Sequence, residues 1–99
     1  MVDTMMLSPV TCMYPSDDYK NLIIEVILPG VEKKDISFKL DEDSFYVVAN
    51  KAGVKYLDTY STCCPVDPKK AVAKYSNGVL KVTVPYQKPL DNLISVKIE

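Results

Sequence analysis

The chain has 99 residues, the size of a single domain, and 47% of them are hydrophobic and 25% charged, as in ordinary globular proteins. It contains no histidine, which excludes Ser–His, Cys–His and His–metal sites. The net charge is -1 and every basic residue is lysine, so we expect no nucleic-acid partner. The sequence has no apolar run of the roughly 18 residues that span a bilayer, and its start lacks the features of a signal peptide. We therefore expect no membrane partner and a cytoplasmic location.

Residues 1–9 form a short Met-rich leader that ends at Pro9. We expect this leader to be mobile, with apolar side chains that find cover only on a partner or on the domain. From Val10 onward, apolar residues recur with the period of two that is typical of strands. The pattern predicts seven strands, at residues 10–14, 22–28, 36–40, 45–49, 54–62, 71–75 and 79–84.

The strand at 22–28 has the strongest signal, because it is β-branched and is stopped by Pro29 and Gly30. Residues 31–35 fit one helical turn, and Asn77-Gly78 predicts a tight hairpin. Residues 86–93 are typical of a linker, and 94–99 form a short apolar alternation. Seven strands and no long helix predict an all-β fold, either a β-sandwich or a small barrel.

The chain has three cysteines, Cys12, Cys63 and Cys64. An odd number of cysteines in a small chain does not indicate a disulfide framework. The adjacent pair Cys63-Cys64 is compatible with a strained disulfide ring or a soft-metal site. The favoured interpretation is free thiols that fill apolar strand positions in a reducing compartment.

An enzyme is the least favoured class. Asp41 and Asp43 are paired carboxylates, but they lie in a polar hairpin turn where solvated charge is the ordinary explanation. The only glycines, Gly30, Gly53 and Gly78, lie in turns and form no phosphate-binding loop. We expect no catalytic residue, no cofactor and no metal. The seven tyrosines are expected to be half-buried strand residues rather than a stacking surface.

Several segments appear in an order that is specific in combination. They are Leu28-Pro29-Gly30-Val31, Lys34-Asp35-Ile36, Val66-Asp67-Pro68, Asn77-Gly78-Val79-Leu80 and Val82-Thr83-Val84-Pro85. In this order they resemble the alpha-crystallin domain of the small heat-shock proteins. The resemblance implies an immunoglobulin-like antiparallel β-sandwich of about seven strands. It also implies a chaperone that holds unfolding proteins without ATP, and three parts: a leader at 1–9, an alpha-crystallin-like domain at 10–85 and a C-terminal extension at 86–99.

Members of this family often end with two aliphatic residues, one residue apart, that dock on a neighbouring subunit. Ile94, Val96 and Ile98 provide two overlapping motifs of this kind. The resemblance places the receiving groove between two strands, with the residues Ile36, Phe38, Leu40, Ala71 and Ala73. The alternative is that residues 93–98 pair as a strand in their own domain, or fray.

Two departures from the family pattern concern assembly. Asp58 stands where the family usually has an arginine between two aromatic residues. Prokaryotic members insert a long loop that crosses to the partner's sheet to form the dimer, whereas only residues 50–53 separate the strands here. Three options therefore remain: a monomer, a dimer through strand edges, of which 54–62 and 10–14 are the expected ones, or a dimer through the leader. We expect a dimer or a smaller species.

Two functions stay open. The first is a chaperone of the holdase type that binds exposed apolar segments of unfolding proteins, with Met5, Met6 and Leu7 as candidate client contacts. The second is an adaptor like the CS-domain cochaperones, which bind one defined chaperone partner. The missing exchange loop favours the adaptor, and the aliphatic motif near residue 98 favours the holdase.

Overall fold

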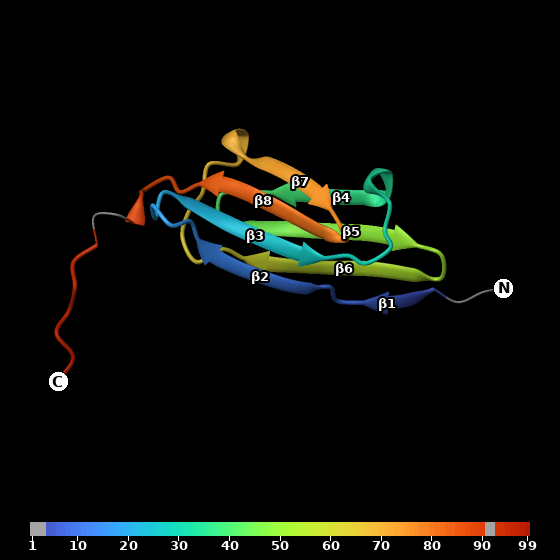
Figure 1. Cartoon of the computed structure of the whole chain (residues 1–99), viewed down its shortest axis with the longest axis horizontal. Coiled ribbons are helices and arrows are strands. Elements are labelled where there is room, and N and C mark those ends of the chain that lie inside the picture. The colour runs from blue at the N-terminus through green and yellow to red at the C-terminus, as the bar shows by residue number, and fades with distance from the viewer. Residues whose placement is uncertain (1–3, 91–92) are drawn as a thin grey trace.

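The computed structural model describes residues 4–90 and 93–99, and shows two four-stranded sheets packed face to face (Figure 1). The first sheet has the strand order β1-β6-β5-β4 and the second has the order β2-β3-β8-β7. The strands are β1 (Met5–Leu7), β2 (Val10–Pro15), β3 (Asn21–Ile27), β4 (Ile36–Leu40), β5 (Ser44–Lys51), β6 (Val54–Ser61), β7 (Val72–Ser76) and β8 (Val79–Pro85). Two single 3-10 turns, η1 (Lys33–Asp35) and η2 (Pro68–Lys70), complete the regular structure. The predicted all-β sandwich is confirmed, with one strand more than the sequence indicated. Within the described ranges, no helix is long and apolar enough to cross a bilayer.

The core lies between the two sheets and follows the period-two pattern. On β3, Leu22, Ile24 and Val26 are fully buried, whereas Ile23 and Ile27 on the opposite face are half-buried. The facing sheet contributes Phe45, Val47 and Ala49 from β5. The remaining buried apolar side chains are Leu28, Val31, Val66, Leu80, Val82, Val84 and Tyr86. Burial of alternate residues from both sheets is what holds the layers together.

Two segments of the resemblance touch each other at one end of the sandwich. Asn77 and Gly78 both have positive φ, 51° and 77°, as the predicted tight hairpin between β7 and β8 requires. The carbonyl oxygen of Gly78 accepts a hydrogen bond from the Leu28 N–H at 2.7 Å. A Cβ on Gly78 would lie 3.3 Å from the Cα of Pro29. The Asn-Gly turn is therefore packed against the Leu-Pro-Gly turn, and a side chain at position 78 would crowd this contact.

The leader differs from its expected mobile state. Met5–Leu7 form β1, which pairs in parallel with Val54–Tyr56 of β6, and the Met5 N–H donates to the Gly53 carbonyl oxygen at 2.9 Å. The chain then crosses to the other sheet to form β2. As a result, β6 is not an edge strand along its first residues, contrary to expectation, whereas β2 is one. The single parallel pair was not foreseen because a strand of three residues leaves no period to detect.

The predicted linker after Pro85 is also different, because its first half is fastened to the sandwich. Tyr86 is only 4% exposed, and its N–H donates to the Lys20 carbonyl oxygen at 3.0 Å. The main-chain N–H of Gln87 donates to the carbonyl oxygen of Pro65, and its side-chain amide donates to the carbonyl oxygen of Val66, both at 2.9 Å. The N–H of Leu90 donates to the carbonyl oxygen of Tyr19 at 2.9 Å, and Leu90 packs on the core. The part of the chain that packs on the sandwich thus continues beyond Pro85, as far as Leu90.

Candidate docking groove and exposed apolar surfaces

The candidate groove lies between β4 and β7, which are the edge strands of opposite sheets on the same side of the sandwich (Figure 1). The hydrogen-bond pattern shows where their main-chain groups point. The main-chain N–H of Asp41 donates to the carbonyl oxygen of Ser44 at 2.8 Å. The main-chain groups of Asp41, Lys39 and Ser37 therefore face β5 in the alternating antiparallel ladder. Ile36, Phe38 and Leu40 therefore direct their N–H and C=O groups away from the sheet, toward the open edge.

A cavity of about 210 Å³ occupies this position. Its lining residues are Lys33, Ile36, Phe38, Ala73, Tyr75 and Leu80. Ile36 and Phe38 come from β4, Ala73 and Tyr75 from β7, and Leu80 forms the floor. The small side chain of Ala73 keeps the groove open, and the walls are apolar apart from the Lys33 ammonium group. Such a groove has room for aliphatic side chains and offers unpaired main-chain groups to an added strand.

Tyr75 fixes one wall of the groove. Its hydroxyl lies 2.7 Å from the carbonyl oxygen of Leu28 and 2.6 Å from that of Val31. One hydroxyl proton is thus shared between two acceptors, and both belong to the Leu-Pro-Gly-Val turn. These two contacts hold the ring in one orientation, although Leu28 and Val31 are 47 and 44 residues away from Tyr75 along the chain.

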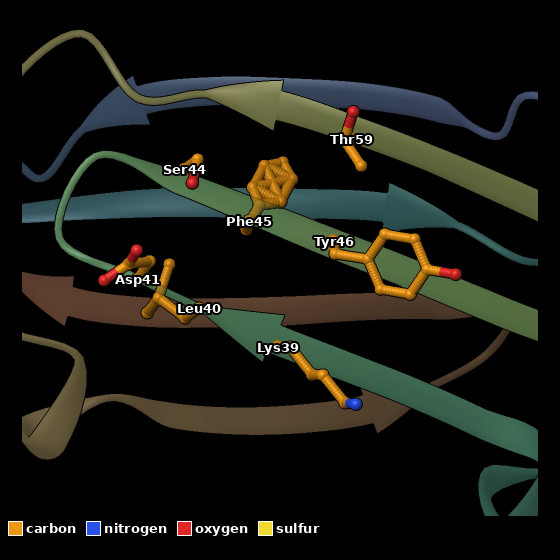
Figure 2. Close-up of a pocket in the computed structure, with 7 residues that line it drawn as sticks. All are labelled: Lys39, Leu40, Asp41, Ser44, Phe45, Tyr46 and Thr59. Carbon is orange, nitrogen blue, oxygen red and sulfur yellow. The ribbon is translucent and has the colours of Figure 1, made fainter.

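The structure brings together three of the five groove residues that the resemblance indicates. Ile36, Phe38 and Ala73 share the cavity, whereas Ala71 lies just before β7 and does not line it. Leu40 lines a different hollow, of about 220 Å³, with Lys39, Asp41, Ser44, Phe45, Tyr46 and Thr59. Figure 2 shows Leu40 beside Asp41 at the end of β4, with Lys39, Tyr46 and Thr59 on three adjacent strands. The sequence reasoning missed Lys33, Tyr75 and Leu80; the tyrosine in the Ala73-Lys74-Tyr75 alternation was the available signal.

The three candidate docking residues are almost wholly uncovered. Ile94, Val96 and Ile98 are 88%, 82% and 93% exposed, and residues 93–99 form no strand. In the structure this segment points away from the sandwich, at the end opposite β1 (Figure 1). With Leu93, which is 73% exposed, residues 93–99 carry four exposed aliphatic side chains, which are unfavourable in water. Association of the segment with an apolar surface would relieve this.

The candidate client contacts on β1 are also exposed. Met5 and Met6 are each 60% exposed and Leu7 is 41% exposed, although all three belong to β1. By register with β6, Met5 and Leu7 lie on the inner face of the sheet, where β2 begins too late in the chain to cover them. The flexible, polarizable Met side chains suit contact with many different sequences.

Asp58 lies on the inner face of β6, opposite the fully buried Val47. The main-chain N–H of Thr59 donates to its carboxylate at 2.8 Å, and this hydrogen bond lowers the pKa of Asp58 below its ordinary value. The residue therefore carries its negative charge at neutral pH where the family usually has a positive one. A carboxylate in place of the guanidinium removes the donor that an inter-strand ion pair would need.

The cysteines lie outside the apolar strand positions expected for them. Cys12 is exposed on the edge strand β2, and Cys63 is exposed in the bend that follows β6. Only Cys64 packs on the core, and its neighbour Cys63 raises the pKa of its thiol by a hydrogen bond. All three are free thiols, and nowhere in the described ranges do three acidic or cysteine side chains gather as a metal-binding set.

The tyrosines also depart from a uniform half-buried set. Tyr14, Tyr19 and Tyr46 are exposed, and Tyr19 lies in a turn with a φ of 58°. Tyr56, Tyr60 and Tyr75 are half-buried as expected. The Tyr86 hydroxyl is buried and finds no hydrogen-bond partner among the residues that the structure describes. Burial, with the nearby Cys63 as the second cause, raises the pKa of Tyr86 to about 12.

Comparison with known proteins decides the family. The chain is 31% identical to a probable 15 kDa heat shock protein of Leptospira interrogans, in a match that covers 94% of this chain and 81% of the relative. It belongs to the small heat-shock protein family. This is a family of chaperones and not of enzymes, in agreement with the turn position of Asp41 and Asp43. No family model matches the chain.

Solved structures of other family members share its fold. Heat shock protein 16.0 from Schizosaccharomyces pombe superposes with a TM-score of 0.74 at 21% identity, over 94% of this chain and 99% of that one. HSP18.5 from E. histolytica gives 0.72 at 17% identity, over 93% and 99% of the two chains. A small heat-shock protein from Xylella fastidiosa gives 0.69 at 13% identity, over 94% and 97%. The likeness confirms the alpha-crystallin sandwich that the sequence motifs indicated.

Proposed function

We propose that this small heat-shock protein is an ATP-independent holdase that binds exposed apolar segments of unfolding proteins in the cytoplasm. The observation that carries the proposal is the exposure of Met5, Met6 and Leu7 on a strand of only three residues. These side chains are available without any rearrangement of the core. Met5 and Leu7 share the inner face of β1 and Met6 lies on its outer face, so both faces of the strand offer apolar surface to an unfolding protein. Three free thiols suit the reducing cytoplasm.

The test is the suppression of light scattering from a heated model client. We expect the chain to delay client aggregation, and a triple variant with Met5, Met6 and Leu7 changed to Ser to lose most of this activity. Val72→Ser is the matched control, because Val72 is an equally exposed apolar residue at a distant strand. Equal suppression by the triple variant and the wild type would contradict the assignment of the client surface to β1.

We also propose that copies of the chain associate through the tail segment Leu93–Glu99 and the β4–β7 groove, or through strand edges, and that the resulting species is no larger than a dimer. The geometry supports the first contact, because the groove has unpaired main-chain groups and the tail has unburied aliphatic side chains. The alternative function, an adaptor for one chaperone partner, predicts a different result. A pull-down would then recover one stoichiometric partner with or without heat, whereas the holdase recovers many proteins after heating.

A further inference from the structure

Among the strand edges that the structure describes, that of β2 is the least protected by its sequence. The edge strands of the two sheets are β1, β4, β2 and β7. Residues 57–61 of β6 continue beyond β1 and also have a free side, but they include the charged Asp58. Natural edge strands are usually protected from pairing by charged residues, by proline or by being very short. β1 has three residues, β4 carries Lys39 and β7 carries Lys74. β2 has six residues and no charge, and prolines stand only at its borders, Pro9 and Pro15.

The direction of the main-chain groups of β2 follows from the hairpin that it forms with β3. The N–H of Ser16 donates to the Asn21 carbonyl oxygen at 2.8 Å, so these two residues form a hydrogen-bonded pair. In an antiparallel ladder such pairs alternate, and Tyr14, Cys12 and Val10 therefore face β3. Thr11, Met13 and Pro15 turn their main-chain groups to the free edge. The position of Pro15 agrees with this, because proline has no N–H to lose at a free edge.

We propose that β2 pairs with β2 of a second copy, antiparallel and centred on Cys12, so that sheet β2-β3-β8-β7 continues across the two copies. This inference rests on the proposed self-association and gives its strand-edge contact a position. The centred register pairs all of residues 10–14 with the same residues of the other copy. Thr11 then lies opposite the other copy's Met13 as a hydrogen-bonded pair, which uses both free N–H groups of each strand.

The side chains agree with this register. On the outer face, Val10 lies opposite the other copy's Tyr14, a β-branched residue against an aromatic ring, which is a favourable cross-strand pair. Val10 is 67% exposed in the single copy, and Tyr14 and Met13 are exposed as well, so pairing removes apolar surface from water. Shifting the register in either direction leaves Val10 or Tyr14 opposite a serine. No charged residue opposes another within the paired segment.

The two copies of Cys12 lie opposite each other in this arrangement, which makes the pairing testable by cross-linking. They form a non-hydrogen-bonded pair, with Cα atoms about 4.5 Å apart, within the range of about 4.4 to 6.8 Å that a disulfide spans. The oxidant diamide removes two electrons and two protons from the two thiols and becomes the hydrazine. The disulfide is only the probe of proximity, and the association needs no oxidation.

The experiment uses the full chain with Cys63 and Cys64 changed to Ala, so that Cys12 is the remaining thiol. We expect diamide to cross-link it at least about 100-fold faster than a control with Cys12→Ala and Val72→Cys, because neighbouring thiols have millimolar effective concentration. Val72 is an exposed residue of the other edge strand of the same sheet. Equal rates for the two proteins would overturn the proposal.

Two further experiments test the register of the β2 pairing and whether β2 or the tail holds the two copies together. In the same background with Cys12→Ala, a mixture of Val10→Cys and Tyr14→Cys proteins should form the mixed disulfide faster than either disulfide with itself, and preference for self-linking would overturn the centred register. Removal of residues 93–99 should leave the Cys12 rate unchanged. A loss of cross-linking on this truncation would overturn the proposal, because the tail contact and not β2 would then hold the copies together. The holdase proposal is tested separately, by the suppression of client aggregation.

Discussion

The hydroxyl of Tyr75 on β7 lies 2.7 Å from the main-chain carbonyl oxygen of Leu28, at the end of β3. The contact joins the wall of the candidate groove to the Leu-Pro-Gly-Val turn. We expect Tyr75→Phe to lower the free energy of unfolding by about 1–2 kcal/mol, because two carbonyl groups lose their shared donor. Urea unfolding measures this, with Tyr46→Phe as the control, since the Tyr46 side chain is exposed. A loss no larger than that of Tyr46→Phe would contradict the structural role of this hydroxyl.

At Tyr86, the change from tyrosine to phenylalanine is expected to stabilise the fold, in contrast to the same change at Tyr75. Its buried hydroxyl has no hydrogen-bond partner in the described part of the chain. Folding therefore costs this hydroxyl its hydrogen bonds to water without replacing them, and a phenylalanine avoids that cost. We expect Tyr86→Phe to raise the free energy of unfolding by about 1 kcal/mol at neutral pH. The measurement is the urea midpoint of the variant against the wild type. A midpoint below that of the wild type would show that this hydroxyl has a partner in solution.

The pH dependence of stability follows from the same residue. The pKa of Tyr86 is about 12 in the folded chain against an ordinary value of 10.0, because burial disfavours the phenolate. Ionisation of Tyr86 leaves the stability unchanged below pH 10 and lowers it as the pH rises toward 12, since the unfolded chain ionises first. We therefore expect the stability of the wild type to fall more steeply than that of Tyr86→Phe across this window. Parallel curves for the two proteins would contradict the raised pKa.

Two glycines with similar backbone angles allow a matched comparison. Gly78 and Gly53 have φ of 77° and 75°, but a Cβ on Gly78 would lie 3.3 Å from Pro29 whereas one on Gly53 meets nothing within 4 Å. Each Ala substitution costs about 1–2 kcal/mol for the left-handed conformation alone. We expect Gly78→Ala to destabilise the chain more than Gly53→Ala in thermal unfolding. Equal effects would mean that the turn moves away from Pro29 without loss.

The tail segment and the groove predict paired effects on association. We expect Val96→Ser with Ile98→Ser, or Ala73→Leu in the groove, to reduce the mass of the protein in light scattering, because each removes the fit between aliphatic side chains and cavity. Lys97→Ala is the control, since Lys97 alternates with the two aliphatic residues. A stable assembly of a dozen or more wild-type subunits would instead contradict the expected dimer or smaller species.

The sandwich itself was predictable from local signals. The alternation of Leu22, Ile24 and Val26 defined a buried face, and Asn77-Gly78 defined a hairpin, because both signals depend only on residues close together in the chain. Three groove residues, Ile36, Phe38 and Ala73, followed from the family resemblance.

The features that were missed depend on contacts between distant residues. β1 forms because Met5 meets Val54, and Tyr86 is buried because it reaches Lys20 and Val66. Neither contact leaves a periodic pattern in the sequence. Leu40 was misplaced because its position at the end of β4, beside the turn to β5, directs it into another hollow.

The three-residue pairing of β1 with β6 has a consequence for how the molecule responds to heat. Short, exposed segments at a sheet edge open at far lower free energy than the core, and they do so without global unfolding. Amide hydrogen exchange at Met5, whose N–H is held by Gly53, should therefore be much faster than at Ile24, and should accelerate at temperatures where the core is still protected. Local opening would then release Met5, Met6 and Leu7 progressively as temperature rises, so that the apolar surface offered to other proteins grows under the conditions in which they begin to unfold.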